Sequence, residues 1–199
     1  MKTEINFLKL KTLVLSYLGD NLPASMHYHD VAHTVDVLKA AERYGLKAGI
    51  SKDNFLLLQT AALLHETGIV ATIDEHEQAS IDYARMILPE FGFSAGQMDS
   101  VCEVIMATRF PQTPLNLLSE LMCDADLDYL GRPDYFAISH KLRLEWIIQN
   151  NYDASLSHWY EEQYAFLSGH RFFTKWAKDE RNAGKESNLQ LIKSLLDSD

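Results

Sequence analysis

Cysteine is scarce in this chain of 199 residues, which contains only Cys102 and Cys123. Two isolated cysteines exclude a disulfide framework and a thiolate metal site of the zinc-finger kind. We therefore expect both to be reduced thiols that lie in or near the core.

Uninterrupted apolar runs and basic residues are also in short supply. No stretch approaches the ~18 apolar residues of a membrane span, and Glu4, Lys9 and Lys11 break the apolar N-terminal segment, which indicates an amphipathic helix. The 18 lysines and arginines are outnumbered by 28 acidic residues, for a formal charge of -10. This charge disfavours nucleic acid and anionic membranes as partners, so we expect a cytoplasmic protein with a small polar or phosphorylated ligand.

A β-strand pattern is also missing, because no run shows convincing alternation of polar and apolar residues, whereas helical periodicity runs through nearly every segment. The sequence therefore predicts an all-α fold, and its length and 47% hydrophobic content predict one domain over residues 1–199. Ser51 is a candidate N-cap, and Gly19 is placed to end the first helix. The expected helices span about 7–19, 30–44, 51–68, 75–88, 95–108, 115–130, 134–150, 156–182 and 188–197.

Three of these helices carry side chains that can bind metal at apolar positions. His29 and His33 are four residues apart, and His33 shares the apolar face of the second helix. Asp126 falls in a four-residue repeat of apolar residues. The buried run 61–68, "AALLHETG", ends in His65 and Glu66, and an unpaired buried carboxylate there would be costly.

Each of these residues has a structural explanation when taken alone. A histidine on an apolar face is more often a hydrogen-bonded core residue than a ligand, and an isolated aspartate can cap a helix or pair with an arginine. The segment "HETGI" does not match the H-E-x-x-H zinc protease motif. Taken together, however, two imidazoles and two carboxylates suit a divalent cation of intermediate hardness.

These motifs resemble those of the HD-domain metal-dependent phosphohydrolases. The resemblance rests on "YHDVAHTVDVL", "AALLHETG" and "CDADLDYLG", with further similarity in "EHEQASIDYARMIL" and "VIMATRFP". It covers about residues 26–131 and implies that helices of segment 134–199 pack on this core. The metal ligands that it implies are His33, His65, Glu66 and Asp126.

The sequence departs from the family pattern at two places. Glu66 replaces the aspartate of the His-Asp doublet, so its longer carboxylate must fold back, bind bidentately or reach the metal through water. Members with two metals resemble this chain at His76 but carry histidine near Thr108 and Arg109. We therefore expect one divalent ion per chain, chosen from Mn, Co, Ni, Fe, Zn and Mg, with Arg109 suited to a phosphate.

The resemblance implies hydrolysis of a phosphate ester of a nucleotide or another small phosphorylated metabolite. The residues that would pass the proton or orient the water are His29, Asp30, His76 and Glu77, and Arg109 would bind phosphate oxygens. Four more basic residues could do so from C-terminal helices, although solvated helix faces are the preferred interpretation for Lys141, Arg143, Arg181 and Lys185.

Two interpretations remain open at this point. The chain is expected to be an enzyme, and the alternative is a ligand-binding module that kept the HD fold but lost turnover through Glu66. The aromatic segment 159–173 is interpreted as core or as the interface of a homodimer, rather than as a platform for a nucleobase.

Overall fold

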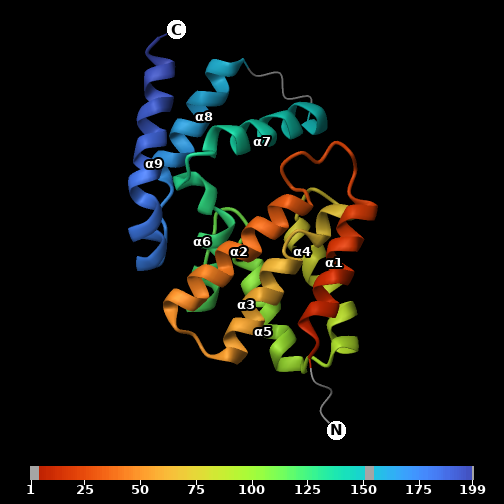
Figure 1. Cartoon of the computed structure of the whole chain (residues 1–199). Coiled ribbons are helices and arrows are strands. Elements are labelled where there is room, and N and C mark those ends of the chain that lie inside the picture. Colours follow the sequence, from red (N-terminus) through yellow and green to blue (C-terminus); the bar gives the residue numbers. More distant parts are fainter. Residues whose placement is uncertain (1–4, 151–154, 199) are drawn as a thin grey trace. The chain divides into compact units, whose positions relative to one another are not determined.

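The computed structural model describes residues 5–150 and 155–198 (Figure 1). Within these residues the chain forms nine α-helices, three short 3₁₀ helices and no strand, which confirms the predicted all-α class. The α-helices are α1 (Phe7–Asn21), α2 (Val31–Ala48), α3 (Lys52–Leu64), α4 (His76–Ile87), α5 (Ala95–Met106), α6 (Leu117–Asp126), α7 (Tyr135–Asn150), α8 (Leu156–Gly169) and α9 (Lys175–Leu196). The 3₁₀ helices are η1 (Thr67–Val70), η2 (Leu88–Phe91) and η3 (Asp128–Gly131). None of the described helices is long and apolar enough to cross a membrane.

The helices fall into two compact units. The first contains the described residues up to Pro23 together with His29–Asp126, and the second contains Ala24–Tyr28 together with the described residues from Leu127 onward. All four predicted metal ligands belong to the first unit. The single domain expected over residues 1–199 stays a prediction.

Helix α3 forms the centre of the first unit. It contacts α1, α2, α4, α5 and α6, and Figure 1 shows it running beside α2. Ser51 caps it as predicted, since the side chain of Ser51 accepts a hydrogen bond from the amide of Asn54. The run Ala61–Leu64 is wholly buried because neighbouring helices surround it. The helix then ends at Leu64, which places His65 and Glu66 directly after its last turn.

Two glycines in this unit do not have the roles expected from sequence. Gly19 lies inside α1, which continues to Asn21. The predicted helix 30–44 likewise continues through the next residue, Gly45, and α2 ends instead at Gly49, whose φ of 63° is the left-handed conformation that glycine adopts easily. A Cβ at Gly45 would lie 3.0 Å from the Phe55 ring, so glycine here allows α2 and α3 to pack closely.

The expected helix boundaries are also wrong in the C-terminal half of the chain. The predicted helix 115–130 ends at Asp126 and gives way to η3. The predicted helix 156–182 is broken after Gly169, and Thr174 caps a new helix by accepting a hydrogen bond from the amide of Ala177. Helix α9 then continues to Leu196, so the predicted segment 188–197 belongs largely to the end of α9.

In the second unit, η3 packs tightly against α9. A Cβ on Gly131 would overlap backbone atoms of Arg181, and a Cβ on Gly184 would overlap the carbonyl of Gly131. The carboxylate of Asp128 accepts hydrogen bonds from Nε and Nη2 of Arg181 at 2.8 and 3.1 Å. Arg181, one of the candidate phosphate ligands, is therefore engaged in a structural ion pair.

Other side chains confirm parts of the sequence interpretation. Cys102 and Cys123 are buried and form no disulfide. Within the aromatic segment, Trp159 and Phe172 are buried in the second unit. Core packing therefore accounts for part of that segment, and a homodimer stays a prediction.

Candidate metal centre

Four side chains from three helical segments converge in the first unit. One ligand atom from each of His33, His65, Glu66 and Asp126 lies within 4.8 Å of every other. Nε2 of His33 and Nε2 of His65 each lie 3.5 Å from Oδ1 of Asp126. Oε1 of Glu66 lies 3.2 Å from Nε2 of His65 and 3.9 Å from Nε2 of His33. The structure thus brings together the complete set that the sequence predicted.

His33 is placed by the start of α2. Asp30 is the N-cap of this helix, and its Oδ1 accepts a hydrogen bond from the backbone amide of His33 at 2.8 Å. The cap fixes the first turn, from which His33 reaches the cluster. Asp30, one of the candidates for proton transfer, therefore uses one carboxylate oxygen to build the helix end.

The turn that carries His65 and Glu66 is fixed by α4. The hydroxyl of Ser80 donates to the carbonyl of His65 at 2.6 Å and accepts from the amide of Gly68 at 2.8 Å. A Cβ on Gly68 would overlap the backbone of His76 and Ser80, so only glycine allows α4 to approach this closely. The "HETG" sequence thus supplies both the candidate ligands and the glycine that lets the turn pack.

Backbone carbonyls orient two of the imidazoles. Nδ1 of His65 lies 2.8 Å from the carbonyl of Ala62, and Nδ1 of His76 lies 3.1 Å from the carbonyl of Ile73. A carbonyl can only accept, so Nδ1 carries the proton in both rings. Nε2 of each ring is therefore directed to the cluster, as in metal sites where the second nitrogen of a histidine is held by an acceptor.

Charges in the cluster shift the pKa values of three of its members. Burial alone would lower the pKa of His65, but the carboxylates of Glu66 and Asp126 outweigh it and raise that pKa to about 9. Burial alone would raise the pKa of Glu66, yet the surrounding histidines, foremost His29, lower it. The pKa of Asp126 is likewise lowered against the effect of burial, by His33 and His65. Without a metal, a proton on His65 balances the buried carboxylates.

The donor set and its spacing fit a divalent cation. Two ligand atoms that each bind an ion at about 2.1 Å lie roughly 3.0–3.4 Å apart when they occupy neighbouring coordination positions. The contacts given above span 3.2–3.9 Å, so small movements would close the site. Within the described residues, the buried atom Oε2 of Glu66 has no hydrogen-bond partner. Such atoms are costly to bury, and a cation would satisfy the carboxylate oxygen and a deprotonated imidazole nitrogen.

Three predicted catalytic residues lie beside the four candidate ligands. Nε2 of His76 is 3.8 Å from Oε1 of Glu66 and 3.5 Å from Oε1 of Glu77, which is itself buried. The ring of His29 lies 5.8 Å from that of His76 and 6.0 Å from that of His33, measured between centroids. His29, His76 and Glu77 therefore add three titratable side chains beside the four candidate ligands.

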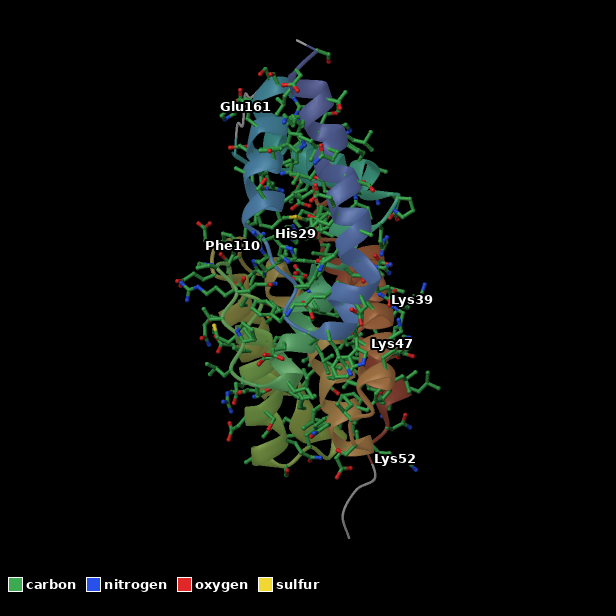
Figure 2. The ribbon with its side chains drawn as sticks, turned by 90° about the vertical axis from the view of Figure 1, so that its left-hand side faces the viewer. His29, Lys39, Lys47, Lys52, Phe110 and Glu161 are labelled. Atoms are coloured by element: carbon green, nitrogen blue, oxygen red, sulfur yellow. The ribbon has the colours of Figure 1, made fainter. Side chains whose placement is uncertain are left out.

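Arg109 occupies a different environment from the other predicted site residues. Its side chain is 53% exposed, and Nη2 lies 2.8 Å from Oε1 of Glu75, the residue before His76. Figure 2 shows the next residue, Phe110, projecting outward. Thr108 is buried and donates to the carbonyl of Ile105. Arg109 thus lies on the surface, tied to the segment that leads into α4.

Sequence reasoning missed Ser80 and Gln112, which both contact the site. The amide nitrogen of Gln112 lies 3.3 Å from Oδ2 of Asp126. Ser80 offered a weak signal, because it falls on the buried face of an amphipathic helix. Gln112 offered none, because it lies in the irregular segment "RFPQTPLN" between α5 and α6, where no periodicity indicates which side chains turn inward.

The sequence matches the HD-domain family over residues 30–128. The chain therefore belongs to the HD-domain superfamily, and the matched region spans all four candidate metal ligands. No curated protein matches the sequence.

Two solved structures share the fold over nearly their whole length. One is the crystal structure of a predicted HD superfamily hydrolase from an uncultured Thermotogales bacterium, with 20% identity, a TM-score of 0.64 and coverage of 97% of this chain and 98% of the other. The second is YpgQ from Bacillus subtilis in complex with ADP, with 19% identity, a TM-score of 0.67 and coverage of 96% of both chains. At this identity the likeness establishes the fold alone.

Proposed function

We propose that this chain is a metal-dependent phosphohydrolase that acts on a nucleotide or another small phosphorylated metabolite. The observation that carries the proposal is the convergence of His33, His65, Glu66 and Asp126, with one buried carboxylate oxygen, Oε2 of Glu66, that lacks a hydrogen-bond partner among the described residues. Membership of the HD-domain superfamily supports the same class of reaction.

The residues that would hold the ion are these four side chains. Two imidazole nitrogens and two carboxylates favour Mn, Fe, Co, Ni or Zn, with Mg a weaker fit because it prefers oxygen ligands. When bound, such an ion would supply a Lewis acid that activates water and neutralises charge on phosphoryl oxygens. One ion per chain is proposed, because Thr108 and Arg109 offer no ligands for a second.

The neighbouring residues would accept the proton of the attacking water and pass it on. His76 is the best placed of them, because its Nε2 faces the cluster and lies between the carboxylates of Glu66 and Glu77. An imidazole within reach of the attacking water can accept its proton as a general base. Glu77 would hold the protonated imidazole in place, and His29 would add a second route to the cluster.

Arg109 would bind the substrate phosphate by giving up its ion pair with Glu75. In the described structure its guanidinium is paired with Glu75 at an exposed position, where ion pairs contribute little to stability. A phosphate offers the same fork a stronger bidentate partner. The complex of YpgQ with ADP supports a nucleotide as one class of substrate for this chain. The net charge of -10 continues to disfavour nucleic acid as a substrate.

The decisive experiment is hydrolysis of a panel of phosphate esters, including nucleotides, with added Mn²⁺, Co²⁺, Ni²⁺ or Mg²⁺. We expect at least one ester to be cleaved, and Asp126→Asn to remove both activity and metal binding. Glu120→Gln is the matched control, because it neutralises another carboxylate of α6 outside the cluster. Activity of Asp126→Asn equal to that of the unsubstituted protein would contradict the metal mechanism.

The role of Arg109 needs a separate substitution. Arg109→Ala should raise the KM for an accepted ester by roughly 10–100-fold, the equivalent of a charged hydrogen bond of about 1.5–3 kcal/mol. Arg85→Ala is the control, because Arg85 also forms an exposed pair at 2.9 Å, with Asp99. An unchanged KM and kcat for Arg109→Ala would remove this arginine from the mechanism.

The alternative function, a binding module without turnover, is favoured by one observation, the glutamate at position 66. It predicts that the purified protein binds a metal ion and cleaves nothing on the panel. Restoration of hydrolysis by Glu66→Asp would then identify the extra methylene as the cause of the lost activity.

A further inference from the structure

Gln112 makes two contacts at the end of α6. Its Nε2 lies 3.3 Å from Oδ2 of Asp126 and 3.4 Å from the backbone carbonyl of Cys123. Both partners are acceptors, so the amide nitrogen, and not the amide oxygen, must face them. This assigns Nε2 and Oε1 of the Gln112 side chain. Both distances are slightly longer than the usual 2.7–3.2 Å of an N–H···O hydrogen bond.

The two oxygens of Asp126 therefore have different surroundings. Oδ2 faces the amide of Gln112, whereas Oδ1 lies 3.5 Å from Nε2 of both His33 and His65. A carboxylate near a metal can bind through one oxygen or through both. Here the second oxygen already has a donor, which holds the plane of the carboxylate and directs Oδ1 alone at the histidines.

The segment that carries Gln112 is itself held at several points. The carbonyl of Ala107 accepts hydrogen bonds from the amide of Thr113 at 3.3 Å and from Sγ of Cys123 at 3.1 Å. These contacts place Gln112 before a metal arrives, so its amide acts as a fixed donor.

We propose that Gln112 is a positioning residue for the metal centre, one that holds Asp126 so that only Oδ1 is offered to the ion. The inference rests on the proposed metal site and goes beyond it by naming the residue that sets the binding mode of Asp126. Without the amide, the carboxylate is free to rotate and bind through both oxygens.

The test is a titration of metal-free protein with Co²⁺, followed in the visible spectrum. Gln112→Met keeps the length of the side chain and removes the donor. We expect about 10-fold weaker Co²⁺ binding, the lower end of the effect of such supporting residues. We also expect weaker visible bands, because an added oxygen ligand raises the coordination number. The matched control Thr113→Val alters the neighbouring exposed residue and should change neither quantity.

The outcomes separate this inference from the proposed function. If the unsubstituted protein binds Co²⁺ but Gln112→Met has the same spectrum and affinity, Gln112 has no positioning role, even if the melting temperature falls through loss of the contact with Cys123. If the unsubstituted protein binds no Co²⁺, both proposals are overturned. Gln112→Asn, whose amide is one methylene too short, is the second variant should Gln112→Met fail to fold, and the same spectral change is expected.

Discussion

Metal binding to this protein should release a proton from His65. In the metal-free protein, burial alone would lower the pKa of His65, but the carboxylates of Glu66 and Asp126 raise it to about 9. An imidazole binds metal only when the ligating nitrogen has lost its proton. Any ion that enters the cluster must therefore displace the proton on Nε2, so its apparent affinity depends on pH.

The size of this effect follows from the pKa. At pH 7.5, a group with a pKa of 9 is protonated about 30 times more often than not, so the apparent affinity is lower by about 30-fold, or ~2 kcal/mol. At pH 8.5 the penalty falls to about 4-fold. The affinity should thus rise about 8-fold over that unit of pH, and close to one proton should be released per ion at pH 7.5. A histidine with an ordinary pKa of about 6.5 would release only ~0.1 proton there.

Isothermal titration with Mn²⁺ in two buffers of different ionisation enthalpy measures the released protons directly. Zn²⁺ is avoided because a water bound to zinc also titrates near pH 7. Release of about 0.1 proton, together with an affinity that stays constant between pH 7.5 and 8.5, would refute the reasoning. It would mean that His65 is neutral before the metal binds, despite the adjacent carboxylates.

Three other substitutions test the site and the second unit. Glu66→Asp should retain metal binding, measured by elemental analysis, because it keeps the charge and both oxygens. Asp128→Asn should lower the free energy of unfolding in urea by about 1.5–3 kcal/mol, since it removes one charged partner of Arg181 and leaves the pair with Glu180, whereas the exposed Asp134→Asn should cost less than ~1 kcal/mol. Burial and nearby positive charges lower the pKa of His170 to about 3, so the unfolded chain binds a proton that the folded chain does not. Stability should fall below about pH 6.5, by at most ~2 kcal/mol at pH 5, and His170→Gln should remove this dependence in urea titrations at pH 8 and pH 5.

The four candidate ligands could be predicted from sequence because each interrupts a helical pattern. His33 and Asp126 each lie on the apolar face of a different helix. In each helix the apolar residues recur about every four positions, and this period indicates which face is buried. His65 and Glu66 end a run too apolar to be exposed. Periodicity identifies a face but gives no distance between helices, so the resemblance to the HD-domain phosphohydrolases was needed to bring the four residues together.

The helix boundaries show where the sequence is less informative. A glycine at position 45 favours the end of a helix, yet α2 continues through it. Glycine is found there because Phe55 packs against that position and leaves little room for a side chain. Gly169 is the single glycine of the predicted helix 156–182, and there the chain does break, since Thr174 can cap the next helix. Local preference is similar at the two sites, and tertiary packing decides between them.

Gln112 and Arg109 show that the sequence does not indicate side-chain direction outside helices. Both lie in the irregular segment between α5 and α6, where side-chain direction has no period. The charge of Arg109 makes it a candidate phosphate ligand, but its pairing with the exposed Glu75 cannot be read from the sequence. Gln112 has no charge and was missed, although its amide contacts a candidate ligand.

The glutamate at position 66 has a physical consequence beyond a longer ligand. Its Oε1 lies within 3.2–3.9 Å of Nε2 of His65, His33 and His76, so one oxygen faces two candidate ligands and the best candidate for proton transfer. An aspartate is shorter by one carbon–carbon bond, about 1.5 Å, and from the same backbone position it would not reach as far toward His76. The extra methylene therefore lets a single carboxylate contact both the metal position and His76. The glutamate thus places one carboxylate oxygen between a candidate metal ligand, His65, and the proposed base, His76.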